Sequence, residues 1–155
     1  MRIGVLADTH MHSFGDIPQK IIDSFSTVDF IIHAGDFTTK GVLNGLKQLG
    51  EVKAVRGNMD SAEIKSMLPV REIIEVGNKK IGITHGSGSP WWIERRVRKI
   101  FDQEQVDIIV YGHSHQSQNK VIEGILFFNP GKATSSFGIL TIEGDEVKGE
   151  IISSK

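Results

Sequence analysis

The sequence predicts an α/β fold in which two β-sheets pack together and helices lie outside. In the first half of the chain, short apolar runs alternate with amphipathic segments, as expected for parallel strands joined by helical crossovers. In the second half, apolar runs follow one another across tight turns, which is typical of antiparallel strands. The 155 residues are enough for a substantial core, so we expect residues 1–155 to form a single domain.

The first half contains three expected strands and three expected helices. The strands cover residues 2–7, 29–33 and 51–56, and the helices cover residues 17–25, 40–49 and 62–68. Pro18 suits the first turn of a helix because its φ angle is already close to the helical value. Gly50 and Pro69 follow the second and third helices, where both residue types favour a helix end. The three strands are therefore expected to be parallel.

The second half begins with a hairpin. Residues 70–76 and 79–84 flank Gly77-Asn78, a pair typical of a tight hairpin turn. A longer amphipathic helix is expected over residues 90–103, and one of its two tryptophans, Trp91 or Trp92, is expected to pack in the core. The remaining strands are expected over residues 107–111, 119–122, 125–128, 136–142 and 146–152, with turns at Glu123-Gly124 and Gly144-Asp145.

The composition is ordinary for a globular protein, with 39% apolar and 24% charged residues. The formal net charge of −1 provides no basic surface of the kind that nucleic-acid-binding proteins use. The chain has no cysteine, which excludes disulfides, thiolate metal ligands and a cysteine nucleophile. No apolar run reaches transmembrane length, and the run before Asp8 is too short for a signal peptide, so we expect a cytoplasmic protein.

Five short polar clusters, each at the end of an apolar run, carry the chemistry of this chain. In α/β sheets ligands bind just beyond the carboxyl ends of strands, so five strand ends would deliver five ligand sets to one place. Carboxylate, amide and imidazole groups together suit Mn²⁺, Fe²⁺, Zn²⁺ or Ni²⁺ better than Ca²⁺. The clusters are Asp8-Thr9-His10, Gly35-Asp36, Gly57-Asn58-Met59-Asp60, His85-Gly86 and Gly112-His113-Ser114-His115.

Taken singly, each cluster also has a purely structural explanation. An Asp or His after a strand often caps a loop, and Gly-Asp and Gly-Asn pairs commonly form turns. The pair His113 and His115 is a stronger signal, because alternate residues beyond a strand can point two imidazoles at neighbouring positions. All five clusters together favour a two-metal site, in which a bridging water loses its proton near neutral pH and the cations bind phosphoryl oxygens.

The order Asp-x-His, Gly-Asp, Gly-Asn-x-Asp, His-Gly and Gly-His-x-His resembles the calcineurin-like metallophosphoesterases. The short chain is similar to their small YfcE-type phosphodiesterase branch. The resemblance runs from residue 3 to about residue 132 and includes the turn Asn129-Pro130-Gly131. It implies a β-sandwich of two mixed sheets flanked by helices, in four αββα layers.

The resemblance also implies the ligands of two divalent metal ions, Mn²⁺ first, with Fe²⁺, Ni²⁺ and Zn²⁺ as alternatives. Asp36 would bridge both ions. The first ion would be held by Asp8, His10 and His115, and the second by Asn58, His85 and His113. Asp36, Asn58 and His85 are the three residues expected to act in catalysis.

The function implied is a binuclear phosphoesterase, more specifically a phosphodiesterase in which the bridging hydroxide attacks phosphorus in line. Its partner would be a small phosphodiester, with no nucleic acid and no membrane, and a homodimer or homotetramer stays open. An alternative is a non-catalytic scaffold that keeps the metal site, as in the retromer subunit of this fold. A nuclease of the same superfamily is a further alternative, and the absence of a basic surface argues against it.

The departure from the family pattern lies at Met59, where many members have a histidine that helps to protonate the leaving group. Methionine has no proton to give, which puts the general-acid step in doubt and favours the scaffold. Asp60 is then available to hold the loop around Asn58. Of the other histidines, His12 is expected on an exposed loop and His33 as a hydrogen-bonded core residue. The basic turn Arg95, Arg96, Arg98 and Lys99 is expected to be a solvated helix face.

Overall fold

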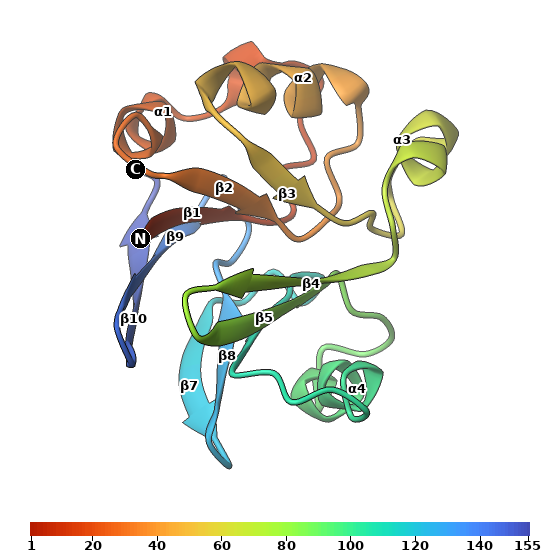
Figure 1. The fold of residues 1–155 in the computed structure, drawn as a ribbon. Helices are drawn as coiled ribbons and strands as arrows, with labels where there is room; N and C mark the ends of the chain where they lie inside the picture. The colour runs from red at the N-terminus through yellow and green to blue at the C-terminus, as the bar shows by residue number, and fades with distance from the viewer.

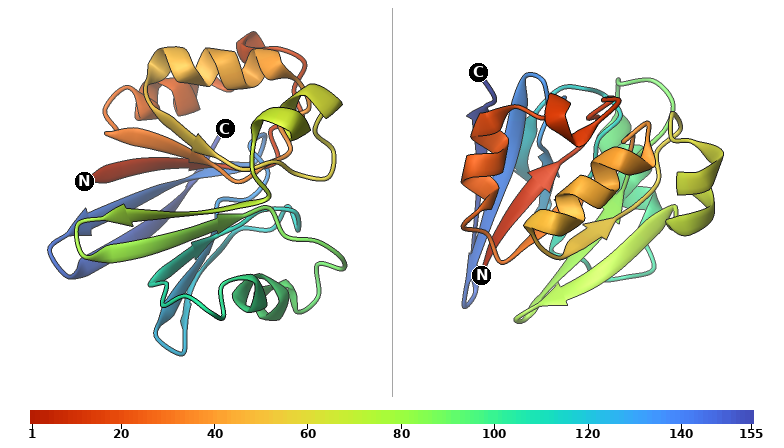
Figure 2. Two further views of the ribbon diagram at one scale, coloured as in Figure 1. Left: turned by 45° about the vertical axis from the view of Figure 1, so that its right-hand side comes forward. Right: turned by 90° about the horizontal axis from the view of Figure 1, so that it is seen from above.

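The computed structural model describes residues 1–155 as two five-stranded sheets packed face to face (Figure 1). Helices α1 (Gln19–Phe25) and α2 (Lys40–Leu49) cover the outer face of one sheet, and α4 (Ile93–Ile100) covers the outer face of the other. The left view of Figure 2 shows these four layers edge-on. The predicted β-sandwich of two mixed sheets flanked by helices is confirmed.

The first sheet has the strand order β10-β9-β1-β2-β3. Strands β1 (Arg2–Leu6), β2 (Phe30–His33) and β3 (Val52–Ala54) are parallel, as predicted. Strands β9 (Ser136–Glu143) and β10 (Glu146–Ser153) return from the end of the chain and add antiparallel strands beside β1. Because β1, β2 and β3 are parallel, the residues that follow them lie at the same edge of the sheet.

The second sheet has the strand order β4-β5-β6-β8-β7. Strands β5 (Lys79–Thr84), β6 (Ile108–Val110) and β8 (Ile125–Asn129) are parallel, whereas β4 (Arg71–Val76) and β7 (Gln118–Ile122) are antiparallel edge strands. The residues that follow β5 and β6 therefore also share one edge. Both sheets are mixed, and the polar loops that follow the parallel strands of each sheet lie at one end of the sandwich.

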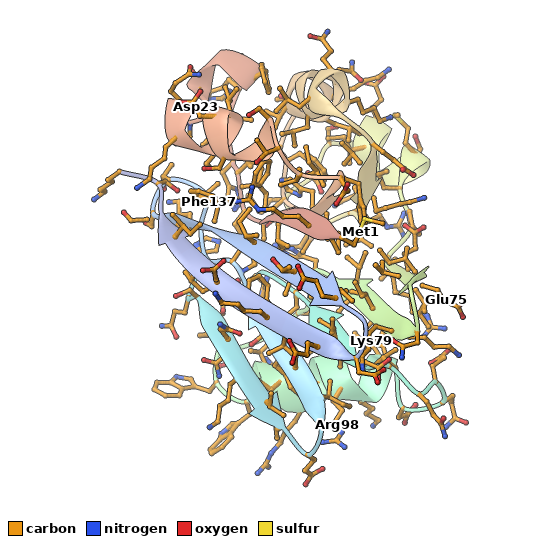
Figure 3. All side chains as sticks on the ribbon, turned by 60° about the vertical axis from the view of Figure 1, so that its left-hand side comes forward. Met1, Asp23, Glu75, Lys79, Arg98 and Phe137 are labelled. Atoms are coloured by element: carbon orange, nitrogen blue, oxygen red, sulfur yellow. The ribbon has the colours of Figure 1, made fainter.

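Three apolar clusters hold the layers together. Alternate residues of the strands point to opposite faces, so Val5 packs between the two sheets and Leu6 packs under α1 and α2. Phe25 of α1 meets Phe137 of β9 edge-on at 5.8 Å between ring centroids, in the layer above the first sheet (Figure 3). A third cluster, which includes Val97, joins α4 to the second sheet.

The fold differs from the sequence prediction most clearly at α4. The helix was expected over residues 90–103 but covers only Ile93–Ile100, because Trp92 has a left-handed φ of 63° and residues 101–103 form turns. The expectation that Trp91 or Trp92 packs in the core is wrong, since the two are 76% and 67% exposed. The Arg95 guanidinium stacks 4.7 Å from the ring centroid of Trp92 instead.

Two short helices complete the chain. A 3₁₀ turn, η1 (Phe14–Asp16), lies within the first polar loop, where no helix was predicted. Helix α3 (Ala62–Met67) begins at Ser61, whose side chain accepts a hydrogen bond from the N–H of Ile64. No helix in the structure has the length and apolar character needed to cross a bilayer.

Candidate metal centre

The polar clusters that follow β1, β2, β3, β5 and β6 meet where the two sheets come together. Within the first sheet, the Asp8 N–H donates to Gly35 O at 3.0 Å. Within the second, the Gly112 N–H donates to His85 O at 3.1 Å. Between the sheets, the N–H of His113 donates to Asp8 Oδ2 at 3.1 Å. These hydrogen bonds connect the strand ends of β1, β2, β5 and β6 to one another.

Two groups of side chains in this region could each hold a cation. In each group, the ligand atoms all lie within 4.8 Å of one another. In the first, Asp8 Oδ1 lies 3.7 Å from His10 Nε2 and 3.5 Å from His115 Nε2. In the second, His85 Nε2 lies 3.8 Å from the same Asp8 oxygen and 3.2 Å from Asp36 Oδ2. The two groups share Asp8, so they are adjacent.

Asp36 faces both groups. Its Oδ2 atom lies 3.5 Å from His10 Nε2, in addition to the 3.2 Å contact with His85 Nε2. Its Oδ1 atom accepts a hydrogen bond of 2.8 Å from the N–H of Met59. A carboxylate in this position could contact cations on either side.

Asn58 and His113 lie together beside the second group. Asn58 Oδ1 is 3.3 Å from His113 Nδ1, and the rings of His113 and His85 meet edge-on with centroids 5.3 Å apart. The rings of His10 and His115 meet in the same way at 5.3 Å on the side of the first group. All seven side chains singled out from the sequence therefore lie in one connected set.

Three atoms of this set are buried without any hydrogen-bond partner. They are Asp8 Oδ1, His10 Nε2 and His85 Nε2. A buried polar atom that is left unpaired costs free energy, and such atoms are rare in folded proteins. Because His10 Nε2 and His85 Nε2 lie 3.7 Å and 3.8 Å from Asp8 Oδ1, divalent cations among these atoms would satisfy all three at once. The residues present therefore fit a metal site.

Main-chain carbonyls orient two of the imidazoles. His85 Nδ1 lies 2.7 Å from Ala34 O, and His113 Nε2 lies 2.8 Å from Gly88 O. A carbonyl can only accept, so each of these ring nitrogens carries the proton. The other nitrogen, Nε2 of His85 and Nδ1 of His113, keeps its lone pair toward the proposed site. Hydrogen bonds of this kind fix the tautomer of metal-binding histidines.

The ionisation of the site reflects its burial. Burial raises the pKa of Asp8 to about 7, although the charge of His85 opposes this. For Asp36, burial also raises the pKa, but the adjacent His85 imidazole outweighs it and leaves the pKa below its ordinary value. Burial lowers the pKa of His85, and the adjacent Asp36 carboxylate outweighs this in turn, so the pKa is raised. A divalent cation would favour the ionised form of both carboxylates.

The backbone of the site is held in an uncommon conformation. Five of the seven site residues have a positive φ, which is costly for residues other than glycine. They are Asp8, His10, Asp36, His113 and His115. Gly57 is required for a different reason, because a Cβ atom there would collide with Asp36 Oδ1. The surrounding contacts must therefore hold these loops firmly.

Asp60 supplies several of these contacts. Its carboxylate accepts hydrogen bonds from the N–H groups of Gly57 at 2.7 Å, Asp36 at 3.0 Å and Thr38 at 2.9 Å. Asp60 thus holds the loop before Asn58, as expected from the sequence, and also the loop that carries Asp36.

Sequence reasoning missed two further supports. Asn129 donates to Gly112 O at 3.2 Å and to Ser114 Oγ at 3.1 Å, and its place in an Asn-Pro-Gly turn was the available signal. Arg96 was expected on a solvated face, but its guanidinium donates to the carbonyls of Ser87 at 2.9 Å and Trp91 at 3.0 Å and also to that of Ser89. Arg96 therefore holds the loop that contains Gly88.

The remaining histidines lie where they were expected. His33 is fully buried and stacks on Phe37 at 3.6 Å between ring centroids. Its Nδ1 accepts from the N–H of Gly35 at 3.1 Å, so its Nε2 carries the proton and donates to Thr9 Oγ1 at 3.2 Å. His12 is exposed. Met59 presents a side chain that is 60% exposed beside the site.

Comparison with known proteins agrees with this geometry. Residues 1–144 match the calcineurin-like phosphoesterase superfamily domain. The chain belongs to this superfamily. A "probable metallophosphoesterase" of Methanocaldococcus jannaschii is 40% identical over 136 residues, which cover 86% of this chain and 69% of the relative. A phosphodiesterase of the same organism is 26% identical over 170 residues, covering 96% and 97% of the two chains.

Solved structures with this fold include a phosphodiesterase and Vps29. An archaeal phosphodiesterase superposes with a TM-score of 0.78 at 25% identity, covering 98% of this chain and 100% of the other. Wild-type Vps29 of Entamoeba histolytica, complexed with Zn²⁺, superposes with a TM-score of 0.80 at 29% identity over all of both chains. Membership of the superfamily supports a hydrolase of phosphoric esters that uses divalent metal ions.

Proposed function

We propose that this protein is a binuclear metal-dependent phosphodiesterase that acts on small phosphodiesters. One observation carries the proposal, namely that Asp8 Oδ1, His10 Nε2 and His85 Nε2 are buried, unpaired and directed at a common space. Such an arrangement costs stability unless cations occupy it. The phosphodiesterase among the relatives supports the choice of reaction.

In this proposal the seven side chains form two sites that share Asp36. Asp8, His10 and His115 complete the first site, and Asn58, His85 and His113 complete the second. Mixed oxygen and imidazole ligands without thiolate favour Mn²⁺, with Fe²⁺, Ni²⁺ and Zn²⁺ as alternatives.

When bound, the cations supply a hydroxide nucleophile near neutral pH and neutralise charge on the phosphoryl oxygens. The chain itself contributes orientation. The Asn58 amide can direct a phosphoryl oxygen, and the His85 and His113 rings are held by the carbonyls of Ala34 and Gly88. Rigid placement of this kind lowers the barrier because no reorganisation is needed during the reaction. Met59 cannot protonate the leaving group, so that proton must come from solvent or from another residue.

The test measures metal content by mass spectrometry and turnover of bis(p-nitrophenyl) phosphate with Mn²⁺. We expect up to two transition-metal ions per chain, chelator-sensitive turnover, and loss of turnover in Asp36→Asn, because an amide cannot neutralise two cations. Full activity in Asp36→Asn, or activity indifferent to chelators, would contradict the binuclear site.

The alternative is a scaffold that keeps its metal site without catalysis. The similarity to Vps29 and the exposed Met59 beside the site favour it. The variant His113→Ala separates the two functions. An enzyme should lose several orders of magnitude in turnover, since removing one such electrostatic contribution costs about 10²–10³-fold or more. A scaffold should show turnover near background in both proteins, and partner binding that survives the substitution.

A further inference from the structure

A cavity of about 400 Å³ opens directly beside the metal centre. Its lining includes Asn58 and His85, which belong to the proposed second metal site. Arg56, Lys65 and Ser87 also line it. Cavities of this size commonly hold small organic ligands. A substrate whose phosphorus lies at the metal centre could therefore extend into this space.

The charges in the cavity are all of one sign. None of its lining residues is acidic, and neither Arg56 nor Lys65 takes part in an ion pair. By contrast, Arg71 on the neighbouring strand β4 is paired with Glu104 at 2.7 Å. Glu63, which shares α3 with Lys65, is paired with Lys40 at 3.1 Å. Two basic side chains without an acidic partner thus line a space that adjoins the proposed metal site.

Arg56 lies on the same loop as Asn58, a ligand of the proposed second metal site, and Lys65 lies on α3, which follows that loop. Arg56 lies two residues before Asn58, and its main-chain N–H donates to Pro69 O at 2.9 Å. Its Nη1 atom donates to the main-chain carbonyl of Lys65 at 2.5 Å, which ties the guanidinium to α3. The other guanidinium N–H groups have no protein acceptor. They are available for an anionic oxygen.

We propose that this cavity binds a second phosphate group of the substrate. The proposal rests on the proposed function and narrows it, because the organic part of the phosphodiester would itself carry a phosphate monoester, as in a nucleoside 5′-phosphate whose 3′-oxygen is part of the diester; a nucleoside 3′,5′-bisphosphate is the corresponding product. Two cations match the two charges of a phosphate monoester better than the single charge of a carboxylate. A guanidinium also binds phosphate oxygens in pairs, with charge-assisted hydrogen bonds.

The test compares two ligands that differ only in the second phosphate. Thymidine 5′-phosphate and thymidine 3′,5′-bisphosphate are titrated calorimetrically into the Mn²⁺-loaded protein. We expect the bisphosphate to bind at least about tenfold more tightly, the effect of one charge-assisted contact. Arg56→Gln and Lys65→Gln should each remove most of this preference. Lys47→Gln removes an exposed, unpaired cation of α2 and should leave the preference intact.

Equal affinity for the two ligands in the wild-type protein would overturn the proposal, as would a preference that survives both cavity substitutions. Lys65→Gln keeps the contact with Arg56, because that contact uses the main-chain carbonyl, so a folding defect is not expected to obscure the result. Turnover of bis(p-nitrophenyl) phosphate is measured on the same sample. Absent turnover with an intact bisphosphate preference would reject the proposed function and leave the cavity assignment standing.

Discussion

Asp36 Oδ2 lies 3.2 Å from Nε2 of His85, although the two residues follow strands of different sheets. Asp36 comes after β2 of the first sheet, and His85 comes after β5 of the second. The contact therefore exists only when the sandwich is closed. A cation bound here would join the two sheets, so metal binding and folding should be thermodynamically linked.

This linkage predicts that Mn²⁺ stabilises the wild-type protein. At a free concentration of 100 times Kd, the free energy of unfolding should rise by about 2.7 kcal/mol. Asp36→Asn should lose most of this gain, because the amide removes the charge facing both groups. Asp23→Asn changes a carboxylate on α1 (Figure 3), a helix that carries no candidate ligand, and this matched control should keep the gain. Denaturant unfolding with and without Mn²⁺ measures the gain in stability of each variant. An equal gain in the two variants would speak against a cation at Asp36.

Asp8→Asn should stabilise the metal-free protein at pH 8. Burial raises the pKa of Asp8 to about 7 in the folded state, from an ordinary value of 3.8. The folded protein then binds more protons than the unfolded chain between these values, so stability falls as the pH rises through this range. Asparagine carries no charge, so the free energy of unfolding of the variant at pH 8 should exceed that of the wild-type protein by about 1–4 kcal/mol. The same variant should not be stabilised by Mn²⁺. Unfolding curves of both proteins in a chelator at pH 4 and pH 8 check this. The prediction is refuted if the free energies of unfolding of wild type and variant differ by the same amount at both pH values.

His33 should make the fold sensitive to acid. Burial lowers the pKa of His33 to about 3, with a further contribution from the charge of His85. The unfolded chain binds a proton below pH 6.5 that the folded protein refuses, so stability is lost as the pH falls from 6.5 toward 3. Between pH 6.5 and 4.5 the wild-type protein should lose about 2–3 kcal/mol more than His33→Gln. Both proteins are unfolded by denaturant in chelator, and parallel pH profiles would show that His33 titrates normally.

The exposed Met59 predicts a steep dependence of rate on the leaving group. Without a general acid at this position, nitrophenyl diesters should be cleaved far faster than alkyl diesters, since acid assistance is typically worth about 10²–10⁴-fold. Met59→His should recover part of this rate for alkyl leaving groups only. A plot of log kcat/KM against leaving-group pKa for both proteins provides the measurement. A shallow slope in the wild-type protein would mean that another residue already donates the proton.

Arg96 should act on the second metal site through the loop that contains Gly88. Its guanidinium donates to Ser87 O and Trp91 O, and Gly88 O orients His113. Arg96→Gln should therefore weaken binding of the second Mn²⁺ by about 10–100-fold, as loss of an orienting contact commonly does. Arg95→Gln removes the neighbouring cation that stacks on Trp92 and is the control. Calorimetric titration of metal-free protein resolves the two ions, and identical isotherms for the two variants would exclude this role.

Much of the candidate metal centre could be predicted from the sequence, because each candidate ligand stands just after an apolar strand. Such runs are recognisable locally, and the strands observed end within two residues of the ranges expected. Parallel strands then bring their carboxyl ends to one edge whatever the details of packing. Asp8, Asp36 and His85 follow from this rule. The chemistry of the residues determined the kind of site in the same way, since Asp, Asn and His without Cys limit the metals that suit it.

Other features were decided by the tertiary structure alone. The carbonyls of Ala34 and Gly88 orient His85 and His113, yet every residue has a carbonyl, so the sequence contains no signal for them. Trp91 and Trp92 are exposed, and α4 begins only after Trp92 with its left-handed φ, which the packing of the layers decides. That Arg56 and Lys65 of the cavity have no acidic partner was likewise decided by the tertiary structure. Whether a basic side chain meets a carboxylate or an open space depends on neighbours that are distant in the sequence.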